Sequence, residues 1–186
     1  LSGEHEVQVS DLYEDQFNPV VSWADFTDER ADALQYMDAQ GQAFKLDAMS
    51  DDLKRETDKL KWADLVIFQF PFWWYGMPAI MKGWLDRVFF NGVAYDYSHT
   101  YDKGLLKGKK AMLVVTTSGG PSAYEPGSRK GDIHQLLKPI TTSFKFTGLE
   151  ALPSIVLYHV GDQAAAALET YQKALKHRIE TCAETV

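Results

Sequence analysis

The sequence predicts an α/β fold in which a parallel sheet carries helices on both faces. Two short apolar runs, residues 65–70 and 111–116, are rich in β-branched and aromatic residues, as strands buried inside a parallel sheet are. Amphipathic helical patterns follow both runs. Strand and helix patterns alternate along the 186 residues, an order typical of such sheets. We therefore expect a single domain spanning residues 1–186.

The first third of the chain contains one predicted strand and two predicted helices. Residues 6–11 alternate between polar and apolar side chains and predict a strand. Residues 27–40 are highly charged and predict a helix whose surface is solvated. Ser50 is a suitable N-cap for a helix that ends near Trp62. Three residues of that helix are expected to face inward: Leu53, Thr57 and Leu60.

The centre of the chain joins a buried strand, an aromatic loop and a helix. The strand 65–70 stops at Pro71, and Pro78 suits the first position of the following helix. That helix carries a core-facing stripe of Met77, Ile80, Met81, Trp84, Leu85 and Val88. Ligands bind where the carboxyl ends of parallel strands meet the loops. The four aromatic residues 72–75 therefore form either a wall for a flat ligand or a plug in the core, and these residues alone leave both open.

The second half of the chain is predicted to complete the sheet. The long connection 91–110 carries Tyr95, Tyr97 and Tyr101, and a connection of this length is usually functional or an interface. Small, flexible residues at 116–121 end the strand 111–116, so their backbone amides and hydroxyls can approach a ligand closely.

A helix, a strand and a final helix follow. The helix over 132–147 has an apolar stripe of Ile133, Leu136, Leu137, Ile140 and Phe144. Pro139 should bend this helix or mark its start, and Gly148 should stop it. The last strand is predicted at 155–158. A final helix should begin at Asp162, with Leu168, Tyr171, Leu175 and Ile179 facing inward.

Composition excludes several classes of function. The net charge of −7 argues against a nucleic-acid partner. The single cysteine, Cys182, excludes an internal disulfide and a cysteine-built metal cluster. No metal site is expected, because the histidines are scattered singly: His5, His99, His134, His159 and His177. The sequence has no apolar run long enough to span a membrane and no signal peptide, so a cytoplasmic location is expected.

Three motifs in order resemble one known family. They are FQFPFWWYGMPAIMKGWLDRVF, then AYDY with YDKGLLKGKKA, then TTSGG followed by a tyrosine. Together they closely resemble the flavin-dependent NAD(P)H:quinone oxidoreductases, the DT-diaphorase family. The resemblance implies a flavodoxin-like doubly wound parallel sheet of strand order 2-1-3-4-5, a homodimer, and FAD as cofactor, with FMN in some relatives. It also implies ping-pong hydride transfer from NADPH or NADH to the flavin and then to a quinone. No GxGxxG fingerprint is present, so the nicotinamide should bind on the flavin.

The resemblance also assigns a flavin site. Backbone groups of Trp73, Trp74 and Tyr75 would hydrogen-bond the edge of the isoalloxazine ring, while Pro71 and Phe72 shape the turn. The other side of the ring would be lined by four residues: Thr116, Thr117, Ser118 and Gly119.

A substrate pocket follows from the same resemblance. Trp74 and Tyr75 would border the pocket where nicotinamide and quinone take turns. Tyr95 and Tyr97 match tyrosines that reach into the site of the partner subunit, and interface packing alone is the alternative for both.

Tyr124 and Lys130 are the candidate catalytic residues. Tyr124 matches a tyrosine near the O2 region of the flavin, where negative charge gathers on reduction, and a surface tyrosine is the alternative. Where the best-known members have a histidine that partners this tyrosine, the sequence has Lys130, beside Arg129. Lysine supplies positive charge but is a poor proton donor near neutral pH. We therefore expect activity with an altered pH dependence. His134 is expected to be an ordinary helix residue, and Arg129 is a candidate for a 2′-phosphate.

The N-terminus departs from the family pattern. Members begin with a strand, a loop and a helix N-terminus that hold the flavin phosphates. The first residues here resemble the end of that helix followed by the second strand. We expect the sequence to be N-terminally incomplete; a protein that truly begins at Leu1 should bind flavin weakly.

A related branch of the family provides the alternative function. Its members act as ancillary regulatory subunits of potassium-efflux systems. A flavodoxin-like electron carrier is less favoured, because the tyrosines at 95–101 and the aromatic loop suit an organic substrate. The sequence leaves open the choice of NADH or NADPH, of FAD or FMN, and of the quinone.

Overall fold

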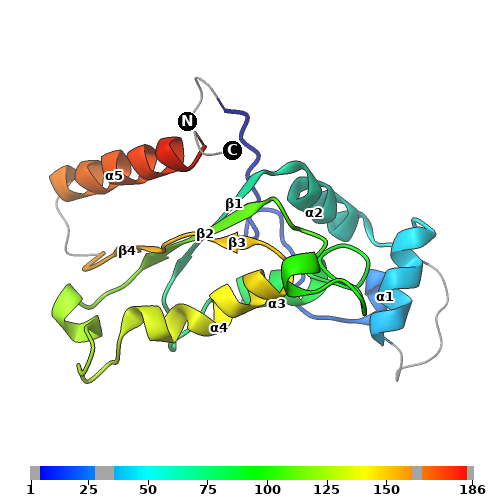
Figure 1. Ribbon diagram of the computed structural model, residues 1–186, viewed down its shortest axis with the longest axis horizontal. Coiled ribbons are helices and arrows are strands. Elements are labelled where there is room, and N and C mark those ends of the chain that lie inside the picture. The colour runs from blue at the N-terminus through cyan, green and yellow to red at the C-terminus, as the bar shows by residue number, and fades with distance from the viewer. Residues whose placement is uncertain (1–4, 28–35, 161–164, 184–186) are drawn as a thin grey trace.

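The computed structural model describes residues 5–27, 36–160 and 165–183. Its centre is a sheet of four strands: β1 (Leu65–Pro71), β2 (Lys110–Thr116), β3 (Glu150–Ala151) and β4 (Ile155–Leu157). β2 pairs in parallel with β1 on one side and with β3 and β4 on the other. Figure 1 shows α5 on one side of this sheet and α3 and α4 on the opposite side. The predicted α/β architecture with a parallel sheet is therefore confirmed.

Alternation of side chains along β1 and β2 builds a core on each face of the sheet. Phe68, Phe70 and Leu113 belong to the large cluster shared with α2, α3 and α4. Met112 and Val114 point the other way and pack with Ile179 of α5. β2 is buried over its central five residues, as expected for an inner strand. β1 is less buried than predicted, because only Phe68 and Phe70 are fully buried and Gln69 is exposed.

The register of the strands brings two loops together at the carboxyl edge of the sheet. β1 and β2 pair from Leu65 with Lys110 to Pro71 with Thr116, so both strands end at the same level. The amide of Phe72 then donates to the carbonyl of Thr116 at 2.8 Å, and the amide of Thr117 donates to the carbonyl of Leu157 at 2.9 Å. The aromatic loop after β1 and the glycine loop after β2 therefore lie side by side.

The helices that precede this edge form largely as predicted. In α2 (Asp51–Trp62) the three inward residues are buried: Leu53, Thr57 and Leu60. Ser50 is the N-cap, but its hydroxyl oxygen accepts no hydrogen bond from the helix backbone, and the hydroxyl donates to Asp52 Oδ1 at 2.6 Å. α3 spans Ala79–Val88, and Pro78 is its N-cap with ψ of 149° instead of its first helical residue.

α4 (Ile133–Phe146) is one continuous helix. Asp132 caps it by accepting from the amide of His134 at 2.9 Å. Pro139 lies inside the helix and does not mark its start. Gly148 has φ of +88°, the left-handed conformation expected of the residue that follows a helix end. The structure adds β3 directly after this stop, a two-residue strand that the sequence pattern was too short to indicate.

Two predictions in the N-terminal part need correction. Residues 6–11 form no strand, and Val7 and Val9 are 55% and 74% exposed. Alternation alone does not make a strand, because the backbone needs a neighbouring strand to pair with. The first described helix, α1 (Tyr36–Lys45), lies further along the chain than 27–40, and residues 28–35 fall outside the described part. α1 also buries Ala39 and Gln40, so it is more than a solvated helix.

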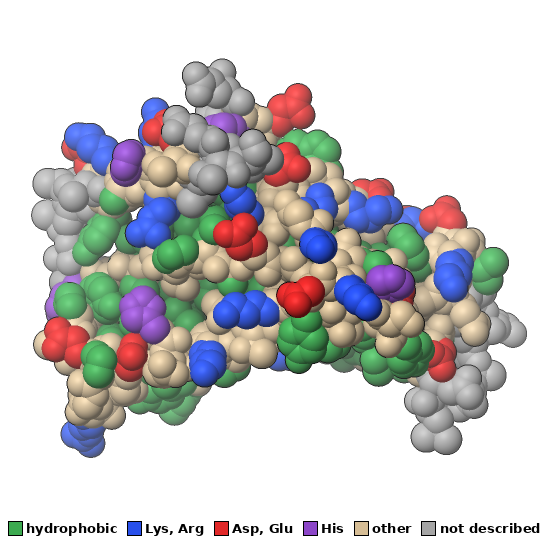
Figure 2. Space-filling view, viewed as in Figure 1, with side chains coloured by type: hydrophobic (Ala, Val, Ile, Leu, Met, Phe, Trp, Pro, Cys, Tyr) green, Lys and Arg blue, Asp and Glu red, His purple; other side chains and the backbone are tan. Residues whose placement is uncertain are grey.

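The last helix covers one face of the sheet. α5 spans Ala165–Ala183, and its predicted start at Asp162 falls outside the described residues. Ile179 is buried and Tyr171 and Leu175 are half-buried, as predicted, but Leu168 is 44% exposed. Among the described residues, none of the helices has both the length and the apolar character that a membrane crossing needs. Acidic, basic and hydrophobic side chains are interspersed on the face seen in Figure 2.

Candidate functional site

The aromatic loop after β1 is a tight turn with an unusual backbone. The amide of Trp73 donates to the carbonyl of Gly76 at 3.1 Å, and the amide of Gly76 donates back at 3.0 Å. The two central residues, Trp74 and Tyr75, have φ of +48° and +63°. Residues other than glycine rarely adopt this left-handed backbone conformation. Such backbone strain is concentrated at ligand-binding sites. The turn directs its side chains away from the sheet.

The rings of this turn project into solvent. Trp73, Trp74 and Tyr75 are 57%, 97% and 54% exposed. Phe72 alone packs inward, with its ring centroid 6.1 Å from those of Tyr75 and Tyr124. A plug in the core is therefore wrong for residues 73–75, whereas Phe72 does pack on the core. An exposed aromatic surface remains, next to the carboxyl edge of the sheet.

The glycine loop after β2 provides backbone donors beside this surface. Thr117 is buried, and its hydroxyl donates to the carbonyl of Gly119 at 2.8 Å, so this side chain holds the loop instead of facing a ligand. Within the described residues, the amides of Ser118 and Gly119 donate no hydrogen bond, and the same is true of Trp74 and Tyr75. Two facing loops thus offer unpaired amides to a ligand, while the side chain of Ser118 is exposed.

Three predicted residues meet at the end of the glycine loop. The ammonium group of Lys130 lies over the ring of Tyr124, 5.0 Å from its centroid. A Cβ atom added to Gly119 would lie 2.8 Å from Lys130 Nζ and 3.1 Å from Tyr124 Cε2. A side chain at position 119 would therefore displace the ammonium group of Lys130 from its place beside Tyr124. Tyr124 is 7% exposed and lies in a 3-10 helix, η4 (Pro121–Tyr124), so the alternative of a surface tyrosine is wrong.

A histidine also lies against the glycine loop. The ring of His159 packs on Gly120, where an added Cβ would lie 2.2 Å from Nε2. His159 was not among the predicted site residues, although its place directly after the last predicted strand is a usable signal. Arg129 is exposed, and His134 contributes its amide to the α4 cap, as an ordinary helix residue does.

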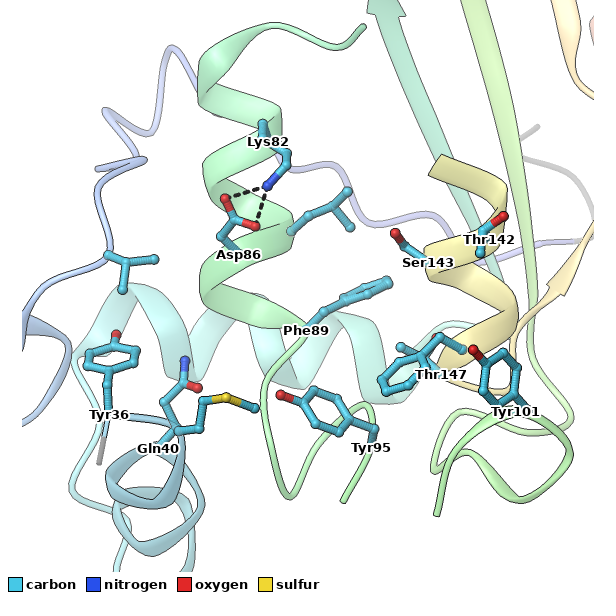
Figure 3. Close-up of a pocket in the computed structure, with 14 residues that line it drawn as sticks. Tyr36, Gln40, Lys82, Asp86, Phe89, Tyr95, Tyr101, Thr142, Ser143 and Thr147 are labelled. Atoms are coloured by element: carbon cyan, nitrogen blue, oxygen red, sulfur yellow. Dashed lines mark hydrogen bonds and ion pairs between the residues drawn. The ribbon is translucent and has the colours of Figure 1, made fainter. Parts of the chain in front are cut away.

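Tyr95 lies apart from the aromatic loop, in a cavity of about 540 Å³. The cavity is open to solvent, and most of its lining residues come from α1, α3, α4 and the connection 91–110, as Figure 3 shows. The ring of Tyr95 lies 5.2 Å from that of Phe146, and Tyr101 in η3 (Tyr101–Lys103) lies 5.4 Å from Phe146 on another side. Burial raises the pKa of the Tyr95 phenol. Phe146 was missed because it lies outside the predicted stripe of its helix.

Tyr97 is on the same connection but outside the cavity lining. Its side chain is 77% exposed, and its hydroxyl donates to Asp38 Oδ1 of α1 at 2.7 Å. None of the residues 73–75 lines the cavity beside Tyr95. Within one chain, the structure thus brings the aromatic loop, the glycine loop, Tyr124 and Lys130 together and holds the two tyrosines elsewhere. Among the described residues, no group of three or more histidine, cysteine or acidic side chains forms a metal site.

The chain is similar in sequence to a known family and to proteins of known function. Residues 1–179 match the protein family described as having a flavodoxin-like fold. The rat protein NAD(P)H dehydrogenase [quinone] 1 is 41% identical over 179 residues, which are 95% of this chain and 65% of that protein. The chain thus spans just under two thirds of that relative.

Similarity to solved structures agrees with the match to the family with a flavodoxin-like fold. A putative quinone reductase from Klebsiella pneumoniae superposes with a TM-score of 0.88 at 38% identity, over 96% of this chain and 73% of the other. General stress protein 14 from Treponema denticola, solved in complex with FMN, gives a TM-score of 0.56 at 26% identity, over 71% of this chain and 72% of the other.

Proposed function

Because this chain belongs to the family with the flavodoxin-like fold, we propose that it is a flavin-dependent oxidoreductase that reduces quinones with NAD(P)H. The observation that carries the proposal is the exposed aromatic turn at 73–75 beside the glycine loop at 117–120. The similarity to a quinone dehydrogenase from rat and to a putative quinone reductase from Klebsiella pneumoniae supports the choice of substrate.

The residues present fit a flavin ring. A flat, electron-poor ring system needs an aromatic surface and amide donors for its ring edge. Trp74 offers the surface, because it is 97% exposed, and the unpaired amides of Trp74, Tyr75, Ser118 and Gly119 offer the donors. The absence of a side chain at Gly119 lets Lys130 and Tyr124 lie close to the backbone of this loop. We propose FAD as the cofactor, with FMN as the alternative that the protein from Treponema denticola exemplifies.

The mechanism assigns distinct tasks to these residues. A bound flavin would supply the two-electron chemistry, by accepting a hydride from the nicotinamide and passing it to the quinone. The amides of the two loops hold the ring edge and fix its orientation. Trp74 and Tyr75 border the pocket beside the reacting face of the ring. NADPH or NADH and the quinone would occupy the same pocket in turn.

Lys130 and Tyr124 provide the electrostatic part of the mechanism. Negative charge that gathers on the ring during reduction is stabilised by a fixed positive charge nearby. Lys130 supplies this charge, and the ring of Tyr124, 5.0 Å from the ammonium group, keeps it in place. The phenol of Tyr124 supplies a hydrogen-bond donor in the same position. These are the two residues that we propose as catalytic.

A homodimer would complete the substrate pocket. Tyr95 and Tyr97 lie away from the aromatic loop of their own chain, so they serve the pocket only if they contribute to that of a second subunit. In the dimer we propose, each connection 91–110 approaches the aromatic turn of the partner subunit. The cytoplasmic location expected from the sequence stays a prediction.

The absorption spectrum of the purified protein tests the proposal. We expect the absorption bands of a bound flavin, and bleaching of the longest-wavelength band by NADPH without oxygen. Added menadione should restore the band, and chromatography of the released cofactor should identify FAD or FMN. A protein that stays colourless, and that reduces no menadione when either flavin is supplied, would contradict the proposal.

A further inference from the structure

Tyr97 is held at the tip of a closed turn. The amides of Asp96 and His99 each donate to the carbonyl of the other, at 3.3 and 3.2 Å. The carboxylate of Asp96 also accepts from the amide of Ser98 at 2.7 Å and lies 2.7 Å from Nδ1 of His99. The backbone on both sides of Tyr97 is therefore fixed, although the ring itself is 77% exposed.

The hydroxyl of Tyr97 is also fixed, by a residue from another element. Asp38 belongs to α1, 59 positions earlier, and its Oδ1 accepts the phenol proton at 2.7 Å. The hydrogen bond and the charge of this carboxylate raise the pKa of the Tyr97 phenol. A side chain that is mostly in solvent normally samples several rotamers. Here one rotamer is selected by Asp38, a partner on α1.

We propose that Asp38 is a positioning residue that locks Tyr97, so that Tyr97 presents its ring and not its hydroxyl proton to a flat quinone. The inference deepens the proposed function and rests on it. A phenol has one proton to donate. Because an ionised carboxylate can only accept, the Tyr97 proton is committed to Asp38 near neutral pH.

The lock has a consequence for substrate choice. With its proton committed, Tyr97 offers only an oxygen acceptor and an aromatic ring to the pocket, and a quinone oxygen is itself an acceptor. Tyr97 should therefore select substrates by flat apolar area. The hydroxyl of Tyr95, by contrast, donates no hydrogen bond within the described part of the chain, so it is available to a quinone oxygen.

Steady-state kinetics of the intact protein with menadione test the lock. Asp38→Ala should raise the KM for menadione about three- to tenfold, the effect of loosening one aromatic contact, with kcat unchanged. Asp38→Asn should stay close to the parent protein, because an amide oxygen still accepts from the phenol. Asp47→Ala is the matched control, because Asp47 follows the same helix and its carboxylate is 88% exposed.

A double-mutant cycle separates positioning from a structural role of Asp38. In a Tyr97→Phe background, Asp38→Ala should have no further effect on KM, whereas in a Tyr95→Phe background its effect should persist. The inference is overturned if Asp38→Ala leaves the KM for menadione unchanged, or if it raises the KM equally with and without the Tyr97 hydroxyl. It is also overturned if Asp38→Asn raises the KM as much as Asp38→Ala does.

A measurement without substrate distinguishes failure of the lock from failure of the proposed function. In NMR spectra of protein labelled with [¹³C]tyrosine, the Tyr97 signal is identified by its loss in Tyr97→Phe. It should titrate at higher pH in the parent protein than in Asp38→Ala. Equal titration shows that the lock is absent and the inference wrong. If Tyr97 titrates at higher pH in the parent protein but the protein reduces no quinone, the proposed function is wrong, and so is the role of Tyr97 in quinone binding.

Discussion

Arg87 and Asp25 form an ion pair that is closed to water. Arg87 Nη2 lies 2.9 Å from Asp25 Oδ1, and the two side chains are 2% and 1% exposed. Nη1 of the same guanidinium lies 2.6 Å from Asp52 Oδ2 and 2.7 Å from the carbonyl oxygen of Asn18. The guanidinium also lies over the ring of Phe17. One arginine thus joins α3, α2 and the N-terminal segment, and so fixes the helix that begins directly after the aromatic turn.

Loss of the arginine should cost much of the stability of the fold. Arg87→Met leaves Asp25 buried without a positive partner, and breaking a buried pair in this way typically costs about 3–5 kcal/mol. Urea denaturation followed by circular dichroism measures the free energy of unfolding. Lys82→Met is the control, because Lys82 lies on the same helix in an exposed pair with Asp86, and such pairs contribute at most about 1 kcal/mol. Equal losses for the two variants would contradict the assigned role.

Glu56 should make the protein sensitive to acid. Burial of this carboxyl would raise its pKa, but hydrogen bonds from Ser10, Trp84 and Lys59 outweigh burial and hold the pKa below the usual 4.5. Because the pKa is lower in the folded than in the unfolded state, the stabilisation is complete above about pH 4.5. It is lost as the pH falls through the folded value.

The variant Glu56→Gln tests the direction and the size of this pH-dependent stabilisation. The amide loses charge-assisted hydrogen bonds, so unfolding at pH 7 should require about 1.5–3 kcal/mol less free energy. Towards pH 3 the difference should shrink, because the parent carboxyl becomes protonated as well as the pH falls through its lowered pKa. Urea midpoints between pH 3 and 7 measure both values, and Glu14→Gln at an exposed position serves as the control. A loss that is the same at both pH values would contradict the assignment.

Sequence reasoning succeeded where a residue depends on its neighbours in the chain. The inward stripe of α2 and the stop at Gly148 follow from helical periodicity and from the left-handed backbone that glycine tolerates. It failed where the outcome depends on a distant element. Residues 6–11 alternate like a strand and form none, and Leu168 continues the apolar stripe of α5 but is 44% exposed.

The same limit applies to the candidate site. The aromatic turn and the glycine loop could be found because each directly follows a buried strand, and a parallel register brings strand ends together. The pairing of Tyr124 with Lys130 came from the resemblance. Asp38 could not be found from the sequence, because it lies 59 positions from Tyr97 and only the packing of α1 brings the two together.

Trp74→Ala should weaken flavin binding without destabilising the fold. The side chain is 97% exposed, so its removal costs almost no buried area. Stacking of an aromatic side chain on a flat ring contributes about 1–3 kcal/mol, so the dissociation constant of the flavin should rise at least about fivefold. Quenching of flavin fluorescence measures this constant, and Trp62→Ala on α2 is the control, with a half-exposed tryptophan elsewhere. A flavin affinity equal to that of the control would exclude the aromatic turn as the binding surface.

Lys130→Met should slow both half-reactions, because the site then lacks its fixed positive charge. Loss of one charge-stabilising group in a closed site typically costs about 10²–10³ in rate, and Lys130 is half-buried, so we expect a decrease of at least about tenfold. Lys130→Arg keeps the charge and should retain most of the rate. Stopped-flow absorbance measures flavin reduction by NADPH and reoxidation by menadione separately. Arg129→Met is the matched control, because Arg129 is the adjacent cation and is exposed. If Lys130→Met leaves both rates unchanged while Trp74→Ala impairs binding, the flavin site stands and the role assigned to Lys130 is wrong.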